Sequence, residues 1–317
     1  MPPEGAAAPG ARDGYFYGGQ AVIEGVMMRG RRHYAVAVRL PRTGEIRVDR
    51  GALTAPIYTQ RVWRLPFLRG LALLAEQLHL GTRSLSWSAQ VNAGAQDIRI
   101  GGREVAVSLA VALVGSVLLF FGLPLLGASL AVHRSSSLGF VLVEGLIRVA
   151  LVLGYLSLIA LVPDVRRVFQ YHGAEHKTIN AYEAGSRLDV DGVRPASVLH
   201  PRCGTGFLLV VLVVSVLVFS VVAVFHPNWF WLVVSRLLGI PVIAGLAYEW
   251  IRLMARHRNH PVVRVLLVPV LYTQRFTTRE PDDGMLEVAI AALKAAIEGD
   301  EPAPLPAGAA LHAEPAP

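Results

Sequence analysis

The sequence predicts a polytopic α-helical membrane protein, with four transmembrane helices in two hairpins and an N-terminal cytoplasmic α+β segment. The first observation is composition: the 317 residues are 53% hydrophobic but only 17% charged, whereas an average soluble domain has about 25% charged residues. The second is a mean hydropathy of +0.47. A disordered or fibrous protein is excluded, because such chains lack apolar residues.

The third observation is a set of four apolar segments, each long enough to cross about 30 Å of hydrocarbon. The first contains Pro124, which can kink a membrane helix without breaking it. Very short turns join the segments in two pairs, which predicts two hairpins of helices. The predicted transmembrane helices are 105–132, 138–162, 206–225 and 230–254.

Lys and Arg lie mainly on one side of these helices. Fourteen precede the first helix, six lie in the long polar loop 163–205 and six follow the fourth, against one and none in the two short turns. Because such residues mark cytoplasmic loops, we expect both termini and the 163–205 loop in the cytoplasm. The net charge of +7 therefore indicates membrane orientation rather than nucleic-acid binding, since no basic cluster with aromatic residues is visible.

The N-terminal 104 residues divide into a tail and a folded segment. Residues 1–14 predict a disordered tail, and they also lack the apolar core of a signal peptide. Within 15–104, alternating residues in 33–40 and 45–49 flank a turn and predict a β-hairpin. Helical spacing of apolar residues in 66–80 predicts an interfacial or packed helix.

The chain after the fourth predicted span divides in the same way. Residues 255–298 form a cytoplasmic segment with a short amphipathic helix, whose apolar stripe is Leu286, Ile290, Leu293 and Ile297. Residues 299–317 are rich in Ala and Pro and predict a second disordered tail.

The strongest chemical signal is the sequence from His172 to His176, which has the H-x-x-E-H order used by one class of zinc peptidases. Histidines four residues apart share a helix face, so both imidazoles can meet one Zn²⁺ at roughly 2.0 to 2.1 Å. Glu175 is then the predicted general base. Two solvated histidines on a helix explain the same pattern equally well.

A catalytic zinc needs a third protein ligand. His200 and Cys203 precede the third predicted span, and antiparallel helices return them to the membrane surface that holds His172. Cys203 is the only cysteine; the alternatives are a small buried residue and a nucleophile with a histidine base. Glu183 is too far along a continuous helix for direct ligation, so we expect Glu183 and Arg202 beside the ligands or facing substrate.

A glycine-rich block covers residues 17–30. Four glycines in 13 residues predict backbone in tight contact or at positive φ, with Glu24 and Arg29 able to reach a site. The spacing does not match a nucleotide-binding loop. The alternative is a glycine-rich strand edge packed on the membrane surface.

Charged residues within the predicted spans form a third group. Such residues usually face the interior of a bundle and pair. A structural Glu144–Arg148 pair, with Arg236 and Glu249 reaching toward the two interfaces, is the favoured interpretation. A small transporter is the alternative, and it predicts all four residues around one cavity.

These blocks resemble the bacterial YqhQ-like membrane proteins, a family described as predicted metal-dependent enzymes. The resemblance spans 17–298 and is carried by residues 18–29, 171–183, 200–205 and 277–283. It departs at Arg31, where proline is expected, and at Gly206, where serine is expected. The resemblance implies that the His and Cys blocks belong to one signature. It also draws in Glu280, Asp282 and Asp283, as a further oxygen ligand or as a helix N-cap.

We therefore expect a hydrolase-type site that uses a divalent metal, zinc, at the cytoplasmic face of a bacterial inner membrane. His172 and His176 bind the metal, His200 or Cys203 completes the site, and Glu175 takes a proton from water. The expected partners are the lipid bilayer and a membrane protein or peptide, without nucleic acid. The competing hypotheses are a non-enzymatic membrane scaffold or assembly factor and the small transporter.

Overall fold

The computed structural model describes residues 17–55, 57, 60–94, 101–132, 137–225, 228–257 and 260–300. The predicted tail 1–14 and residues 301–317 of the second tail lie outside this part of the chain. The last helix continues to Asp300, two residues into the predicted tail. There the Asp300 carboxylate accepts hydrogen bonds from the backbone N–H groups of Arg32 and His33, at 2.7 and 3.0 Å.

A four-stranded antiparallel sheet in the order β1-β2-β3-β4 forms the N-terminal part of the fold. The last two strands are the predicted β-hairpin, which is confirmed with Arg39 opposite Ile46. The glycine-rich block forms the first two strands and places β1 at an edge of the sheet. The strands are β1 (Gly18–Val22), β2 (Gly25–Arg29), β3 (His33–Arg39) and β4 (Ile46–Ala52).

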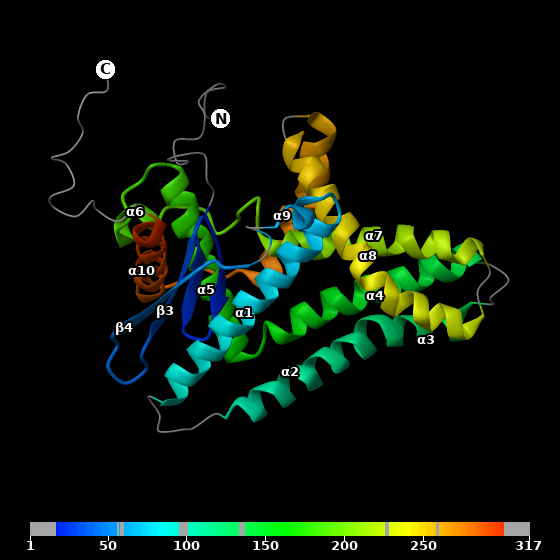
Figure 1. The fold of residues 1–317 in the computed structure, drawn as a ribbon, viewed down its shortest axis with the longest axis horizontal. Helices are drawn as coiled ribbons and strands as arrows, with labels where there is room; N and C mark the ends of the chain where they lie inside the picture. Colours follow the sequence, from blue (N-terminus) through cyan, green and yellow to red (C-terminus); the bar gives the residue numbers. More distant parts are fainter. Residues whose placement is uncertain are drawn as a thin grey trace, which may run out of the picture.

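Both faces of the sheet are covered, as Figure 1 shows. Helices α5 (Pro163–Glu183) and α10 (Asp283–Asp300) cover one face, where Val26 and Met28 are buried. Helix α1 (Leu68–Gly94) covers the other, where Met27 lies against Leu80 in a second apolar cluster. Successive residues of β2 therefore enter opposite cores, and both positions are apolar.

The apolar stripe predicted for the C-terminal helix is confirmed in α10. Leu286, Ile290 and Leu293 are all buried against β2, β3 and α5. Segments that are separate in the sequence thus share one core: the N-terminal strands, the polar region 163–205, and the C-terminal helix. This joint core fixes the position of the histidines of α5 relative to β1.

Helix α1 is longer than predicted, because it continues from residue 80 to Gly94. The extension has few large apolar residues, but Leu80, Ser84, Ser88 and Asn92 recur every fourth position and are buried. Small polar residues at this spacing let the helix pack closely on the sheet, and they give a weak apolar signal in the sequence. The short 3-10 helix η3 (Arg61–Arg64) precedes α1.

Four helices are long and apolar enough to cross a membrane, judged by length and composition of the described residues: Gly102–Ala131, Leu138–Ile159, Gly204–Val224 and Trp229–Met254. They correspond to the four predicted spans. The first consists of α2 (Gly102–Val117), a π-helical turn η4 (Leu118–Gly122) and α3 (Leu123–Ala131). The π turn precedes Pro124, whose missing N–H disrupts the regular helical ladder.

The remaining candidate spans belong to α4 (Ser137–Ile159), α7 (Gly204–Val224) and α8 (Trp229–Arg256). Helix α4 packs against α3 and α7, and α7 packs against α8. In Figure 1 these helices extend away from the sheet to the right. Their shared core is apolar and includes Val141, Val210 and Phe219.

Three helices lie in the segments predicted as polar connections. The 163–205 region contains α5 and the short α6 (Val190–Val193). Helix α5 ends at Glu183, and Gly185 follows at φ +72°, the left-handed backbone conformation that commonly ends a helix. Helix α9 (Pro261–Thr277), which the sequence did not predict, follows α8.

Candidate metal site

Helix α5 brings the two histidines of the H-x-x-E-H sequence together on one face. The ring centroids of His172 and His176 lie 4.4 Å apart. The segment after α9 crosses this helix closely, since a Cβ atom at Gly173 would lie 2.0 Å from the carbonyl oxygen of Arg279. Glycine at this position permits the crossing. This crossing brings the carbonyl group of Thr277 next to His172.

Backbone carbonyl groups fix the orientation of both imidazoles. Nδ1 of His172 lies 2.9 Å from the carbonyl oxygen of Thr277, and Nδ1 of His176 lies 2.5 Å from that of Val198. A carbonyl oxygen only accepts, so each Nδ1 carries the proton and donates it. In a neutral imidazole the lone pair then resides on Nε2. This arrangement prepares a histidine to bind a metal through Nε2.

Cys203 lies next to these lone pairs, at the N-cap of α7. Its Sγ is 3.3 Å from Nε2 of His172 and accepts a hydrogen bond from the backbone N–H of Thr205 at 3.4 Å. The hydroxyl group of Thr205 also lies 3.3 Å from Sγ. The thiolate is the form of cysteine that binds metals.

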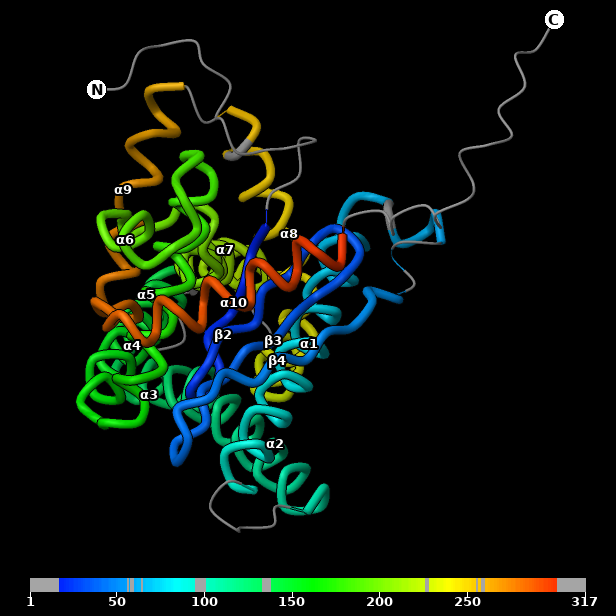
Figure 2. The backbone as a smooth tube through the Cα atoms, turned by 90° about the vertical axis from the view of Figure 1, so that its left-hand side faces the viewer, coloured from blue at the N-terminus to red at the C-terminus, as the bar shows by residue number. Residues whose placement is uncertain are grey.

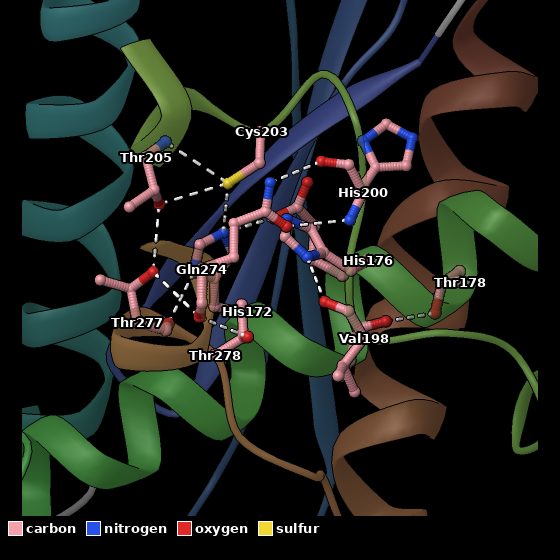
Figure 3. A network of polar contacts seen from close by, with 12 residues as sticks. His172, His176, Thr178, Val198, His200, Cys203, Thr205, Gln274, Thr277 and Thr278 are labelled. Atoms are coloured by element: carbon pink, nitrogen blue, oxygen red, sulfur yellow. Dashed lines mark hydrogen bonds and ion pairs between the residues drawn. The ribbon is translucent and has the colours of Figure 1, made fainter. Parts of the chain in front are cut away.

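His172, His176 and Cys203 together provide three metal-binding atoms within 4.8 Å of one another. Two Zn–N bonds of about 2.05 Å and a Zn–S bond of about 2.3 Å in tetrahedral geometry require separations of roughly 3.3 to 3.6 Å. The three side chains therefore need only small movements to share one ion. Figure 3 shows them converging from α5 and from the turn before α7.

Glu175 faces the same cluster from the side of β1. It is 5% exposed, and its Oε2 lies 3.8 Å from Nε2 of His172. Burial raises the pKa of the Glu175 carboxyl to about 7, against the opposing effects of His172 and a backbone hydrogen bond from Gly19. A carboxyl group with such a pKa can exchange a proton with water near neutral pH.

Gly19 in β1 forms the wall of the site opposite α5. A Cβ atom there would lie 2.8 Å from Cγ of Glu175 and 2.6 Å from the carbonyl oxygen of Met27. A side chain would push β1 away from α5. The glycine-rich block thus provides the tight backbone contact that its composition predicts, and Gly19 supplies this contact.

His200 lies behind the cluster rather than within it. Its ring centroid is 5.6 Å from that of His176, and in Figure 3 the ring points away from Cys203. Gln274 holds the backbone of His200, with its Oε1 2.9 Å from the N–H and its Nε2 2.8 Å from the carbonyl oxygen. Of the two residues predicted to complete the site, the structure brings Cys203 to the histidines of α5.

The carboxylate of Glu183 also lies outside the three-residue cluster. It contacts the guanidinium group of Arg202, and its Oε2 is 3.9 Å from Nε2 of His200. Burial raises the pKa of Glu183, but contacts with His200 and Arg202 outweigh this effect and lower it. Burial lowers the pKa of His200, which keeps its imidazole neutral. Glu183 and Arg202 thus support the residue behind the site.

The two charged residues of the glycine-rich block do not reach the cluster. Glu24, at φ +51° in the turn between β1 and β2, forms two 2.6 Å hydrogen bonds with Arg167 of α5. The guanidinium group of Arg29 contacts Glu76 of α1 at 3.1 Å. These pairs attach the β1–β2 hairpin to the helices on its two faces.

The acidic residues near the start of α10 also have other partners. Glu280 pairs with the buried amine of Lys177, and Asp283 pairs with Arg194 at 2.9 Å. Asp282 accepts a hydrogen bond from the backbone N–H of Met285 at 2.8 Å, as an N-cap does. Of the two predicted roles, the structure gives the helix N-cap to Asp282, whereas Glu280 and Asp283 form ion pairs that were not predicted.

The charges in the candidate spans form two separate groups. Glu144 contacts both Arg148, at 2.5 Å, and Arg236, and all three are buried. The prediction that Arg236 reaches an interface is therefore wrong, because its positive charge turns inward to the Glu144 carboxylate. Glu249 instead pairs with Arg69 of α1. The transporter hypothesis requires all four residues to surround one cavity, and they do not surround one point.

Several residues that build the site carried no chemical signal in the sequence. The carbonyl groups of Thr277 and Val198 act through the backbone, so their residue types reveal nothing. Gln274 and Thr205 are common polar residues, and only the return of α9 to the start of α7 gives them partners. Gly19 alone had a signal, as one of a cluster of glycines.

The fold and site define a predominantly helical protein, in which four helices of membrane-spanning length join a layered sheet-and-helix unit with a His-His-Cys cluster at the junction. Residues 65–299 match the family described as "Protein of unknown function (DUF1385)", and the chain belongs to this family. It is 36% identical over 289 residues to the "Uncharacterized protein YqhQ" of Bacillus subtilis (strain 168), covering 86% of this chain and 90% of that protein. No solved structure matches the chain.

Proposed function

We propose that the protein is a membrane-embedded, metal-dependent enzyme of the hydrolase type, with a Zn²⁺ site formed by His172, His176 and Cys203. One observation carries the proposal. Both histidines donate a hydrogen bond from Nδ1 to a backbone carbonyl group, and a ring nitrogen of each lies within 4.8 Å of the other and of Sγ of Cys203, with Nε2 of His172 3.3 Å from Sγ. Imidazole and thiolate are both zinc ligands, and a catalytic zinc site combines three protein ligands with an open fourth position.

The remaining groups have roles that follow from their positions. A bound divalent metal supplies Lewis acidity and lowers the pKa of water. Glu175, with Oε2 3.8 Å from Nε2 of His172, accepts the proton that the attacking water loses. The backbone N–H of Gly19 orients this carboxylate, and the close contact of β1 with α5 limits access of bulk solvent.

The proposed location is a bacterial cytoplasmic membrane, spanned by two helical hairpins. The excess of Lys and Arg outside the short turns supports an orientation with both termini and the 163–205 region in the cytoplasm. Cys203 directly precedes α7, one of the candidate spans. In this orientation the site lies at the cytoplasmic membrane surface. Its substrate is a peptide or a lipid-linked group.

Metal analysis of the detergent-purified protein tests this function. We expect stoichiometric zinc in the wild type and loss of zinc in His176→Ala. His79→Ala, an exposed histidine on α1, is the matched control and should keep the metal. Equal trace amounts of metal in all three proteins would exclude the zinc site.

The 3.3 Å contact between Sγ of Cys203 and Nε2 of His172 also supports a second candidate function, in which Cys203 is a nucleophile and His172 its base. Alkylation of metal-free protein distinguishes this function. A nucleophilic cysteine reacts rapidly with iodoacetamide near neutral pH, and His172→Ala slows the reaction. A slow reaction in both proteins would eliminate this candidate.

A further inference from the structure

Helix α9 has an unusual surface for a helix outside the four candidate spans. Five large apolar residues of this helix are between 48 and 69% exposed: Val262, Val265, Leu266, Val268 and Tyr272. Its only charged residues are Arg264 and Arg275, and it contains no acidic residue. A water-facing helix normally carries polar residues on its exposed face. The exposed face of α9 is therefore suited to an apolar environment.

The other face of α9 packs on α7 beside the candidate metal site. Val270 lies so close to Gly206 that a Cβ atom at Gly206 would be 2.3 Å from its Cγ1. Thr277, at the end of α9, bonds to Thr205 at the start of α7. The exposed apolar residues of α9 thus continue the apolar surface of a candidate span.

The direction of α9 differs from that of the candidate spans α4 and α7 (Figure 1). In Figure 1 helix α9 runs across the direction of α4 and α7. In Figure 2 it runs from top to bottom within the plane of the picture, whereas α7 is seen nearly end on. Its 17 residues correspond to about 25 Å, short of the roughly 30 Å of hydrocarbon. A helix of this length and direction fits along a membrane surface rather than through it.

We propose that α9 lies in the headgroup layer of the bilayer, with Val265, Leu266 and Val268 in contact with the acyl chains. Interfacial helices bury an apolar face about 5 to 10 Å into this boundary and place Lys or Arg near anionic lipid. Arg264 and Arg275 supply that charge. The guanidinium group of Arg275 also lies 4.9 Å from the ring centre of Tyr272, an aromatic residue of the type enriched at membrane interfaces.

This placement fixes the depth of the candidate site. The carbonyl group of Thr277 orients His172, and Gln274 holds the backbone of His200, so α9 carries two of the contacts around the site. The site therefore lies at headgroup depth. This inference rests on the membrane insertion in the proposed function and is independent of a bound metal.

Spin labels on the full chain in nanodiscs of phosphatidylcholine and phosphatidylglycerol measure the environment of α9. Labels are attached at Val265→Cys and Val268→Cys in a Cys203→Ser background, with Val48→Cys on exposed β4 as the matched aqueous control. We expect oxygen collisions to exceed those of a water-soluble nickel complex at positions 265 and 268, and the reverse at position 48. The same labelled positions are also measured in a chain that keeps Cys203, after subtraction of the signal from a label on Cys203. Agreement between the two backgrounds shows that Cys203→Ser does not change the fold.

Two results would overturn the proposal. If collisions with the nickel complex exceed those with oxygen at positions 265 and 268, the exposed face of α9 is in water. Low accessibility to both reagents, with dipolar broadening between labels, would show that a second copy of the chain covers this face. Neither result depends on metal binding, so failure here is distinguishable from failure of the zinc site.

Discussion

Sγ of Cys203 lies 3.3 Å from Nε2 of His172, although 31 residues separate them in the sequence. Because the carbonyl group of Thr277 accepts a hydrogen bond from Nδ1–H of His172, a neutral His172 presents the lone pair of Nε2 to the sulfur. While it is protonated, the thiol has two acceptors at 3.3 Å, this imidazole and the hydroxyl group of Thr205. Once the thiol loses its proton, imidazole and thiolate together are suited to one metal ion.

Metal-linked stabilisation should depend on Cys203. At a Zn²⁺ concentration of about 100 times Kd, the free energy of unfolding of the wild type should rise by about 2.7 kcal/mol. Cys203→Ser should lose most of this gain, because a hydroxyl group is a poor zinc ligand. Denaturant unfolding in detergent, with and without Zn²⁺, measures the difference. His79→Ala should keep the full gain, and an equal gain in Cys203→Ser would contradict the assignment of this ligand.

Gly19→Ala should destabilise the fold by about 1–3 kcal/mol, because overpacking forces backbone shifts of this order. The new methyl group would meet Cγ of Glu175 at 2.8 Å and the carbonyl oxygen of Met27 at 2.6 Å. Gly18→Ala in the same strand is the control, since nothing lies within 4 Å of its added Cβ atom. Similar unfolding midpoints for the two variants would show that β1 does not press on α5.

The sequence predicted the parts of the fold that have a regular period or composition. The candidate spans, the β3–β4 hairpin and the buried stripe of α10 each repeat apolar residues at the expected interval. Strand β2 shows why other parts escaped. Val26 and Met27 enter opposite cores, so burial on both faces removes the polar alternation that identifies a strand. Helix α9 was missed because Pro269 lies inside it, and an interior proline normally ends or kinks a helix.

The candidate site was predictable only in part. The spacing of His172 and His176 indicated a shared helix face, and topology brought Cys203 near them. His200 and Cys203 were indistinguishable in the sequence, because both precede α7 by a few residues. Which of the two lies beside the histidines of α5 depends on Gln274 of α9, because this residue forms hydrogen bonds with the backbone of His200. Long-range contacts of this kind leave no pattern in neighbouring residues.

Asp300→Ala should detach the end of α10 from the sheet. Its carboxylate accepts hydrogen bonds from the backbone N–H groups of Arg31, Arg32 and His33, which would lose a charged acceptor. Hydrogen bonds to charged groups contribute about 1.5–3 kcal/mol, so we expect a loss of this size in the free energy of unfolding. Glu298→Ala is the control, because Glu298 forms one exposed pair with Arg50. Equal losses in the free energy of unfolding for the two variants would show that Asp300 does not attach α10 to the sheet.

Glu144→Gln should be far more destabilising than Glu249→Gln, although both carboxylates lie in candidate spans and pair with arginine. Glu144 is 1% exposed and neutralises Arg148 and Arg236, whose guanidinium groups also stack near the ring of Phe219. Its loss leaves two buried positive charges without a counter-charge, and breaking a buried pair costs about 3–5 kcal/mol. The side chain of Glu249 is 28% exposed and, among the described residues, pairs with Arg69 alone, so its loss leaves one partly exposed positive charge. A pair near the surface contributes only about 1 kcal/mol. Unfolding of both variants in mixed micelles measures the contrast, and equal losses would show that the Glu144 cluster does not hold α4 and α8 together.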